Sequence, residues 1–415
     1  MSPVDLITPQ TAAPRRWLSI VGIGEDGIEG LSPMACRLVS EAEVVFGGRR
    51  HLGLAAVLIR GTARAWPSPF DRAVNEVCGY QGRDVCVLAS GDPFLYGIGS
   101  TLARAMDPSE MRVVPAPSAF SLAAARLGWA LPETTLLSFH GRSLDLVRPH
   151  LQPGARLLAL TPDAAGPAAV ARLLAQSGFG ASRVTVLEAL GGSRECIRAA
   201  LAEAFDLESV DPLNTVAIEV TASSEARIIA RASGVSDTLF EHDGQITKRE
   251  IRAVTMSSLA ARRGELLWDI GAGAGSIAIE WMLADPTMRA IAIEARADRA
   301  ARIRRNAANF GVPGLEVIEG EAPAALEGLE RPNAIFVGGG ASEAGVLDAA
   351  VGALSRSGRL VVNAVTIATE AMLLARHSAL GGELIRTAVA RVEPLRGASV
   401  WRQALPVTQW IWTKP

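Results

Sequence analysis

Short apolar runs alternate with stretches of helical period through the first 220 residues. These runs predict strands at 17–23, 44–46, 85–90, 112–114, 136–139, 156–160, 184–190 and 215–220. Several runs are apolar at every position, as in strands that are covered on both faces. Two predicted helices have capping signals, because Ser32-Pro33 precedes the helix at 34–40 and Ser118 precedes the helix at 119–127.

The pattern loosens at residues 221–247 and then restarts with a more regular rhythm. We place a domain boundary in this stretch, between a first domain at 15–225 and a second at 240–415, because it lacks a long apolar run. The second domain is predicted to have helices at 248–261, 276–284, 297–310 and 342–355, and strands at 265–270, 290–294, 315–319, 334–338 and 359–364. This alternation predicts an α/β domain with a doubly wound parallel sheet.

The composition is that of a soluble enzyme. The chain has 415 residues, with 41 Lys and Arg against 43 Asp and Glu, so its charge of −2 favours neither nucleic acid nor an anionic membrane as a partner. Its four cysteines are far apart, which predicts neither a disulfide framework nor a metal site. The N-terminal residues lack the features of a signal peptide, and no apolar run is long enough to span a bilayer. We therefore expect a cytoplasmic protein.

The strongest local signal lies at the end of the predicted strand at 265–270. It reads Asp269-Ile-Gly271-Ala-Gly273-Ala-Gly275, an acid and three glycines at alternate positions before a helix. Glycines let the backbone turn sharply and approach a ligand closely, and a helix N-terminus offers N–H groups to that ligand. A dinucleotide site would instead read Gly-x-Gly-x-x-Gly. The spacing resembles the first motif of the Rossmann-like (class I) methyltransferases that use S-adenosylmethionine (SAM).

Further positions in the second half fit this resemblance. Glu294 lies at the end of the next predicted strand, where a carboxylate can accept hydrogen bonds from both ribose hydroxyls. Glu321-Ala322 follows the third strand, where this class has an acid and a small residue beside the adenine. Thr247, before the first strand, and Gly338-Gly339-Gly340 resemble the small cobalamin-pathway methyltransferase domain. The resemblance implies SAM contacts from Thr247, Asp269, Gly271, Gly273, Gly275, Glu294, Glu321 and Ala322.

The first half contains a different series of motifs. One predicted strand ends in Gly91-Asp92-Pro93, and the next leads into Pro115-Ala116-Pro117-Ser118. In this order they resemble the tetrapyrrole methylase family, a class III SAM-binding fold of two αβα lobes with the ligand in the cleft between them. The chain departs from the family at Glu25-Asp26-Gly27, where the family often has Gly-Pro-Gly. The resemblance implies SAM contacts, largely through backbone groups, from Gly91, Asp92, Pro93, Pro115 and Ser118.

Two unrelated methyltransferase folds in one chain predict a substrate that is methylated twice. Together they resemble cobalamin-pathway enzymes that methylate a tetrapyrrole at C5 and C15 and remove the ring-C acetate carboxylate as carbon dioxide. The resemblance assigns C5 to the first domain, and C15 with decarboxylation to the second, with one SAM site in each. It also implies an anionic tetrapyrrole substrate and a homo-oligomer. The conjugated macrocycle can itself accept electrons, so we expect neither a metal nor a pyridoxal cofactor.

Substrate contacts are expected from groups that can bind carboxylates. Arginine pairs bidentately with carboxylates, which makes the stretches 49–51, 140–142 and 262–263 candidates, although most such runs are solvated surfaces. Our substrate candidates are His140, Arg142 and Asn363, each near the end of a predicted strand. We assign no catalytic residue, because methyl transfer to an electron-rich carbon requires alignment more than acid–base groups.

Other functions fit parts of the pattern. The chain could methylate another tetrapyrrole intermediate, or bind SAM or a corrinoid as a regulatory sensor without turnover. A nucleotide-binding oxidoreductase would use the glycine turn as an NAD site, but Asp269 and the absence of Gly-x-x-Gly spacing disfavour it. RNA methylation is disfavoured by the net charge and by the lack of a basic and aromatic patch.

Overall fold

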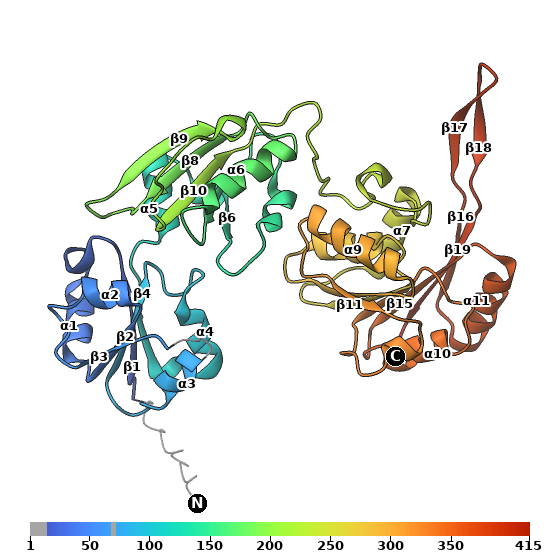
Figure 1. Cartoon of the computed structure of the whole chain (residues 1–415). Coiled ribbons are helices and arrows are strands. Elements are labelled where there is room, and N and C mark those ends of the chain that lie inside the picture. Colours follow the sequence, from blue (N-terminus) through green and yellow to red (C-terminus); the bar gives the residue numbers. More distant parts are fainter. Residues whose placement is uncertain (1–14, 68–71) are drawn as a thin grey trace, which may run out of the picture. The chain divides into compact units, whose positions relative to one another are not determined.

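The computed structural model describes residues 15–67 and 72–415 (Figure 1). We expect no signal peptide at the N-terminus, and those residues lie largely outside the described part of the chain. The chain divides into two compact units, the first made of residues up to 142 and 153–224, the second of residues 143–152 and 225–415. The second unit thus includes a short segment, the 3-10 helix Leu144–His150, that lies within the sequence of the first.

The first lobe of the first unit is a five-stranded sheet in the order β3-β2-β4-β1-β5, with all neighbours parallel. Its strands are β1 (Leu18–Ile23), β2 (Val44–Gly47), β3 (Thr62–Ala65), β4 (Val85–Ser90) and β5 (Met111–Val114). Its helices are α1 (Pro33–Glu41), α2 (Arg49–Leu54), α3 (Ala73–Cys78) and α4 (Ile98–Ala105). The predicted cap of α1 is confirmed, because Ser32 Oγ accepts a hydrogen bond from Ala35 N at 3.2 Å.

The second lobe of this unit has a mixed five-stranded sheet in the order β6-β7-β10-β8-β9. The strands are β6 (Thr134–Ser138), β7 (Arg156–Leu160), β8 (Arg183–Glu188), β9 (Cys196–Leu201) and β10 (Asn214–Glu219). Only the β6–β7 pair is parallel among the pairs of this sheet in the described residues. Helices α5 (Ala119–Leu127) and α6 (Gly166–Gln176) pack on it. Two lobes with separate sheets are the arrangement expected of the tetrapyrrole methylase fold.

The second unit is built on a seven-stranded sheet in the order β13-β12-β11-β14-β15-β19-β16. Its parallel strands are β11 (Leu266–Ile270), β12 (Arg289–Glu294), β13 (Glu316–Glu319), β14 (Ala334–Val337) and β15 (Arg359–Ala364). Strands β16 (Glu383–Thr387) and β19 (Val407–Thr413) are antiparallel additions at one edge. The helices are α7 (Arg249–Leu259), α8 (Ser276–Ala284), α9 (Ala297–Asn309), α10 (Val346–Ala353) and α11 (Ile367–Leu380).

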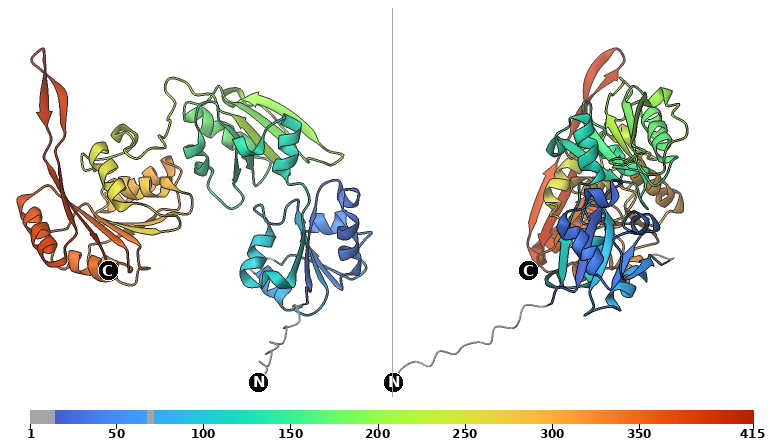
Figure 2. Two further views of the ribbon diagram at one scale, coloured as in Figure 1. Left: turned by 180° about the vertical axis from the view of Figure 1, so that it is seen from behind. Right: turned by 90° about the vertical axis from the view of Figure 1, so that its left-hand side faces the viewer.

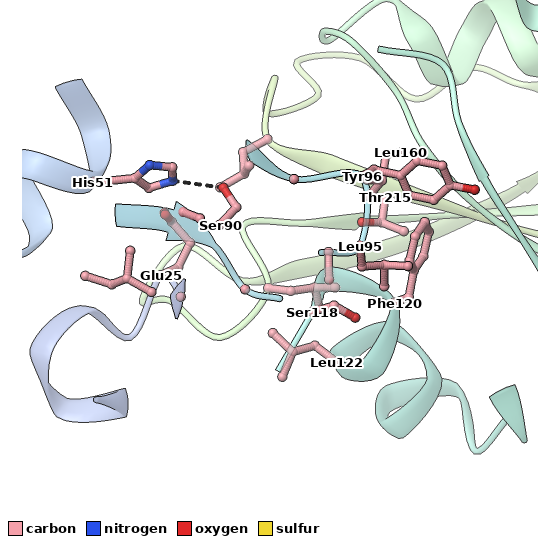
Figure 3. A pocket seen from close by; sticks show the side chains of 18 of the residues that line it. Glu25, His51, Ser90, Leu95, Tyr96, Ser118, Phe120, Leu122, Leu160 and Thr215 are labelled. Carbon is pink, nitrogen blue, oxygen red and sulfur yellow. Dashed lines mark hydrogen bonds between the residues drawn. The ribbon is translucent and has the colours of Figure 1, made fainter. Parts of the chain in front are cut away.

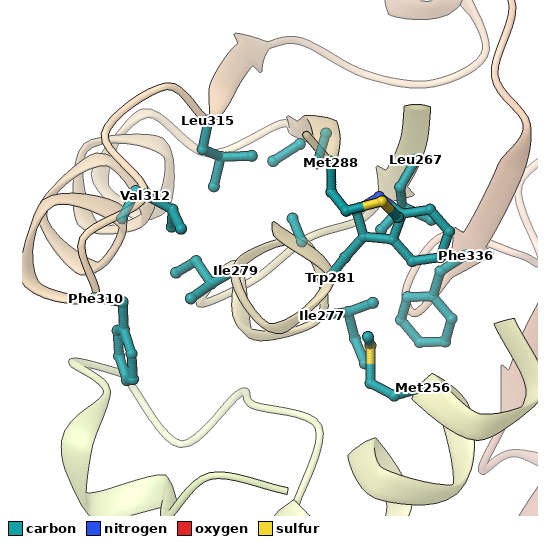
Figure 4. Close-up of a cluster of buried hydrophobic side chains, with 14 of the residues drawn as sticks. Met256, Leu267, Ile277, Ile279, Trp281, Met288, Phe310, Val312, Leu315 and Phe336 are labelled. Atoms are coloured by element: carbon teal, nitrogen blue, oxygen red, sulfur yellow. The ribbon is translucent and has the colours of Figure 1, made fainter. Parts of the chain in front are cut away.

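Both faces of this sheet are covered by apolar side chains. Successive residues of β11 point to opposite faces, and Leu267 and Trp268 accordingly belong to two different buried clusters. One cluster packs Trp281 of α8 against Met256, Met288 and Phe336 (Figure 4). Trp268 and Trp281, which flank the glycine turn in the sequence, are both core residues, since each is at most 2% exposed.

The structure differs from the predicted elements mainly at the sheet edges. The short edge strand β3 is exposed at every position, and β9 is mostly exposed, so neither has the apolar run that predicts a strand. Strands β17 (Ala390–Leu395) and β18 (Ala398–Gln403) form a two-stranded ribbon that extends away from the sheet (Figures 1 and 2). The parallel sheet predicted for the second half is confirmed for β11–β15, and β19 and β16 add an antiparallel edge to it. Within the described residues, no helix could cross a membrane.

Candidate active sites

A cavity of about 320 Å³ lies between the two lobes of the first unit (Figure 3). The ends of β1 and β4 line one side, and the start of α5 and parts of the second sheet line the other. Apolar side chains such as Leu95, Phe120 and Leu160 make up much of the wall. The cavity is therefore at the carboxyl ends of parallel strands, the position at which open α/β sheets bind ligands.

Three loops beside this cavity are tied together through their backbones. Gly91 N donates to Ile23 O at 3.1 Å, and Ala116 N donates to Gly91 O at 3.1 Å. Gly22, near the end of β1, lies so close to both loops that a Cβ there would be 1.9 Å from Gly91 O and 2.6 Å from Ala116 N. Only glycine fits at this position without moving the two loops that the family resemblance assigns to the cofactor.

The predicted residues of the first unit fall partly on this cavity. Gly91, Ser118 and His140 line it, whereas Asp92, Pro93, Pro115 and Arg142 do not. Asp92 Oδ1 accepts from Phe94 N at 2.8 Å and stabilises its own loop. Ser118 Oγ caps α5 by accepting from Ser121 N at 3.1 Å. Arg142 places its guanidinium 5.5 Å from the ring centroid of Tyr96, a residue that lines the cavity.

The candidate stretch 49–51 contributes Arg50 and His51 to a polar cluster at the edge of this cavity, whose third member, Ser90, was not predicted. His51 Nε2 lies 2.8 Å from Ser90 Oγ and 2.8 Å from Arg50 Nη2, and Arg50 Nη2 donates to Ser90 Oγ at 2.9 Å. Arg50 also pairs with Glu25, which Arg194 approaches at 3.4 Å. Burial, and then the positive charge of Arg50, lower the pKa of His51 to about 4.

A second cavity, of about 400 Å³, lies in the second unit. Its walls come from the loops after β11 and β14, the segment 245–251, and residues at the base of the β17–β18 ribbon. Thr247, Asp269, Gly271, Gly273 and Asn363 line it, as the sequence analysis predicts for residues near the cofactor. Lys248, Arg299 and Arg391 line the same cavity, where Arg391 pairs with Glu250 and Arg299 pairs with Asp243.

The glycine turn is closely packed beneath this cavity. Gly271 has φ +69°, and a Cβ there would be 2.6 Å from Gly339 O, so the turn requires glycine on two grounds. Asp269 is 1% exposed, and its Oδ2 accepts from Ala278 N of α8 at 3.1 Å. Its other oxygen, Oδ1, is buried without a hydrogen-bond partner among the described residues. This side chain thus presents an unsatisfied acceptor next to the cavity.

Glu294 is in register with the glycine turn but does not line the cavity. Its Oε2 accepts from Gly273 N at 2.8 Å, and its Oε1 accepts from Arg296 N at 3.1 Å. Each oxygen can accept one more hydrogen bond. Gly275, Glu321 and Ala322 also lie outside the cavity wall. Of the glycine turn, the end of β12 and the residues after β13, only the glycine turn therefore forms much of the cavity wall.

Asn363 is held by a network of side chains that the sequence did not reveal. Its Nδ2 donates to Thr255 Oγ1 at 3.1 Å, and its Oδ1 accepts from Gln409 Nε2 at 2.8 Å. Gln409 comes from β19, and Ser258 of α7 donates to it at 2.7 Å. The network connects three elements and presents the Asn363 amide to the cavity in one orientation.

Two ionic clusters position the loop that contains Thr247. Arg252 of α7 is fully buried and donates to Glu280 at 2.5 Å, to Asp237 at 3.0 Å and to the backbone oxygens of Val235 and Thr247. Separately, Asp243 pairs with Arg299 at 2.9 Å and Arg302 at 3.2 Å. Arg302 is thus an ion-pair partner rather than part of a solvated face. Within the described residues, no group of three His, Cys, Asp or Glu side chains could hold a metal ion.

Comparison with known proteins matches a different family to each half of the chain, in the order that the motifs predict. A family model described as tetrapyrrole (corrin/porphyrin) methylases matches residues 18–206, and a model described as precorrin methyltransferase domain matches residues 238–414. Over 414 residues the chain is 60% identical to a precorrin-6Y C(5,15)-methyltransferase [decarboxylating] from Sinorhizobium sp, with 100% of both chains covered. The chain belongs to the precorrin-6Y C(5,15)-methyltransferase (decarboxylating) family.

Two other relatives of this chain match only part of it. A probable cobalt-precorrin-6B C(15)-methyltransferase (decarboxylating) from Saccharolobus solfataricus is 37% identical over 142 residues, 33% of this chain and 71% of the relative. A cobalt-precorrin-7 C(5)-methyltransferase from Salmonella typhimurium is 30% identical over 183 residues, 43% of this chain and 88% of the relative. Each relative is named for one of the two positions that the full-length relative combines.

Asp269→Asn is expected to stabilise the unliganded second unit at neutral pH. Burial raises the pKa of Asp269 from 3.8 to about 7, so the native state retains a proton that the unfolded chain has released. The contribution of Asp269 to the free energy of unfolding therefore falls as the pH rises from about 4 to about 7. An uncharged amide does not titrate, so the variant does not lose this stability. The gain in the free energy of unfolding should grow across this window to on the order of 1–4 kcal/mol.

Urea unfolding of wild type and variant across this pH range measures the difference. Asp285→Asn is a matched control, because Asp285 is only partly buried and hydrogen bonds from Thr287 lower the pKa of its carboxyl. Its variant should lose stability relative to wild type as the pH rises, which is the opposite sign. A pH-independent difference for Asp269→Asn would contradict the prediction.

Proposed function

We propose that this chain uses SAM to methylate precorrin-6B at C5 and C15, with loss of the ring-C acetate carboxylate as carbon dioxide, giving precorrin-8X. The observation that carries this is the presence of two separate cavities, one in each methyltransferase fold, in a chain that aligns end to end with a named C(5,15)-methyltransferase. C5 methylation belongs to the first unit, and C15 methylation with decarboxylation to the second. Separate relatives that are named for C5 and for C15 methylation support one methylation per domain.

SAM fits the second cavity through the groups that line it. The close approach of the glycine turn and the unpaired Oδ1 of Asp269 suit a ligand that brings a hydrogen-bond donor, such as an ammonium group. Thr247, Gly273 and Glu294 would complete the contacts at the turn. In the first unit, Gly91, Ser118 and the loops of Asp92, Pro93 and Pro115 would hold the second SAM, mainly through backbone groups. SAM supplies the methyl group to each reaction.

The protein's own contribution is alignment in a water-poor cavity. Holding two reactants in line can lower a barrier by about 7–11 kcal/mol. The tied loops of the first unit and the Asn363 network of the second provide rigid walls for this purpose. Apolar side chains such as Phe336 and Ile277 line part of the second cavity, and an apolar surrounding would favour loss of a charged carboxylate as neutral carbon dioxide.

The substrate is an anionic tetrapyrrole in this proposal. Lys248, Arg299 and Arg391 line the second cavity and can meet its carboxylates together with the Asn363 amide. In the first unit, His140 lines the cavity, and Arg142 lies beside it on Tyr96. The positive charges of Lys248 and Arg142 would favour an anionic macrocycle over a neutral polycyclic substrate.

Mass spectrometry of the full chain incubated with precorrin-6B and SAM tests the proposal. The expected product has gained two methyl groups and lost one carbon dioxide. Asp269→Asn should abolish C15 methylation and decarboxylation while leaving the first cavity intact, so SAM binding persists at one site. An unchanged substrate mass in the presence of bound SAM would overturn the substrate assignment. Binding of NADH in place of SAM would favour the oxidoreductase instead.

A further inference from the structure

The polar cluster at the edge of the first cavity has no role in the function proposed above. Ser90 is the last residue of β4 and directly precedes Gly91, and its side chain lines the cavity. His51 reaches it from α2 (Figure 3), with 2.8 Å between Nε2 and Oγ. His51 also lines the cavity. A histidine and a hydroxyl in contact beside a ligand cavity can accept and pass on a proton.

The protonation of His51 follows from its partners. Arginine can only donate hydrogen bonds, so Arg50 Nη2, 2.8 Å away, requires an unprotonated Nε2. Arg50 also donates to Ser90 Oγ, so the serine hydrogen shares the single lone pair of Nε2 with Arg50 and takes it over when Arg50 donates to Ser90 alone. The imidazole is therefore neutral, with its hydrogen on Nδ1. That Nδ1 is buried without a hydrogen-bond partner among the described residues.

The surrounding charges keep the ring neutral. Burial and Arg50 lower the pKa of His51 to about 4, so the base is available across the physiological pH range. Glu25 holds Arg50 through an ion pair and is approached by Arg194 on its other side. We would expect a histidine that only anchors α2 to have hydrogen bonds at both ring nitrogens. His51 Nδ1 instead has no partner among the described residues, which costs the fold stability. The arrangement is that of a weak base beside a cavity.

We propose that His51, acting through the Ser90 hydroxyl, accepts the proton released during methyl transfer in the first cavity. This rests on the proposed function. The methyl carbon leaves the sulfonium sulfur, which keeps the electron pair of the broken bond, and a π electron pair of the substrate forms the new carbon–carbon bond. The cationic substrate then loses the hydrogen that the methyl group replaces. Ser90 Oγ takes this proton while passing its own to His51 Nε2, which becomes an imidazolium as Arg50 gives up its hydrogen bond to Nε2 and keeps the one to Ser90.

A weak base is adequate for this step because the proton comes from a cation. The methylated macrocycle carries the positive charge that the sulfonium has lost, and its C–H bond is correspondingly acidic. Repulsion from Arg50 then favours release of the proton from the imidazolium to solvent and restores the neutral ring. Ser90 is the group placed to touch substrate, and His51 acts through it.

The test measures C5 methyl transfer by the full chain carrying His51→Ala, with and without added imidazole. We expect the rate to fall by roughly 10²–10⁴-fold, the range for a general base, while the KM for SAM and C15 methylation by the same molecules stay unchanged. Imidazole should restore part of the rate. 1,2,4-Triazole has the same shape but is far less basic, and it should not. Rescue by both compounds would mean that the ring serves only for packing and would overturn the inference.

Variants of the neighbours make the test specific. Ser90→Ala should slow C5 transfer, and Ser90→Thr, which keeps the hydroxyl, should restore it. Arg37→Ala is the control, because Arg37 is exposed on α1 of the same lobe and does not line the cavity. An unchanged rate in His51→Ala would refute the inference. Absence of C5 methylation in the wild type would instead refute the proposed function, so the two failures are distinguishable.

Discussion

Replacing Arg252 by alanine is expected to lower the free energy of unfolding of the second unit by about 3–5 kcal/mol. The guanidinium is fully buried, with Glu280 at 2.5 Å and Asp237 at 3.0 Å. Removing it leaves the Glu280 carboxylate in the core without its counter-charge, and it leaves the backbone oxygens of Val235 and Thr247 without a donor. Since Thr247 lines the second cavity, SAM affinity there should fall as well.

Thermal or urea unfolding of the full chain measures this loss, and the transition of the first unit serves as an internal reference. Arg249→Ala is the matched control, because Arg249 is exposed on the same helix and its loss should change stability little. Arg252→Lys should recover only a small part of the lost stability. An ammonium group cannot reach the four acceptors that lie around the planar guanidinium. Equal stability of Arg252→Ala and Arg249→Ala would show that the buried pair contributes nothing.

Gly22→Ala is expected to abolish C5 methyl transfer while leaving C15 transfer intact. The added methyl group would sit 1.9 Å from Gly91 O, a backbone atom that cannot rotate away, so the Gly91 loop and the Ala116 loop must move apart. A displacement of about 1 Å at a reacting centre can reduce the rate by 10²-fold or more. We therefore expect a loss of at least about 10²-fold in C5 methylation and weaker SAM binding in the first unit.

Product analysis by mass spectrometry, with single-turnover rates, tests this variant in the full chain. Gly53→Ala is its control, because a Cβ at Gly53 of α2 would meet nothing within 4 Å and Gly53 does not line the cavity. If Gly22→Ala and Gly53→Ala methylated C5 equally well, the tied loops would not be part of the cofactor site. Loss of the C15 product in Gly22→Ala would mean that the two units do not act independently.

The cavity-lining residues were predictable where chemistry and spacing coincide in a single stretch. Asp269, Gly271 and Gly273 form the wall of the second cavity because a strand, a sharp turn and a helix follow one another directly in the sequence. Glu294 was located correctly at a neighbouring strand end, but its carboxylate is already hydrogen-bonded to the glycine turn. Glu321 and Ala322 lie outside the cavity wall, because the strand before them is the outermost of the sheet.

Contacts between distant segments were not predictable from local pattern. Arg252 and Glu280 look like ordinary charged helix residues until α7 and α8 pack together and bury both. His51 and Ser90 are 39 residues apart, and only the parallel pairing of β2 with β4 brings α2 to the end of β4. Neither contact can be read from the sequence. Whether two distant segments meet depends on the fold and not on the number of residues between them.

By itself, the sequence determined the two fold classes, the order of the domains, the glycine turn and the helix caps at Ser32 and Ser118. These features depend on residues that are close in the chain, where hydrophobic period, backbone freedom and capping act locally. Only the tertiary structure decided the antiparallel edge of the second sheet, the buried Arg252 cluster and the meeting of His51 with Ser90. Each of these depends on long-range packing, in which the free energy of burying a side chain is set by partners that no local pattern identifies.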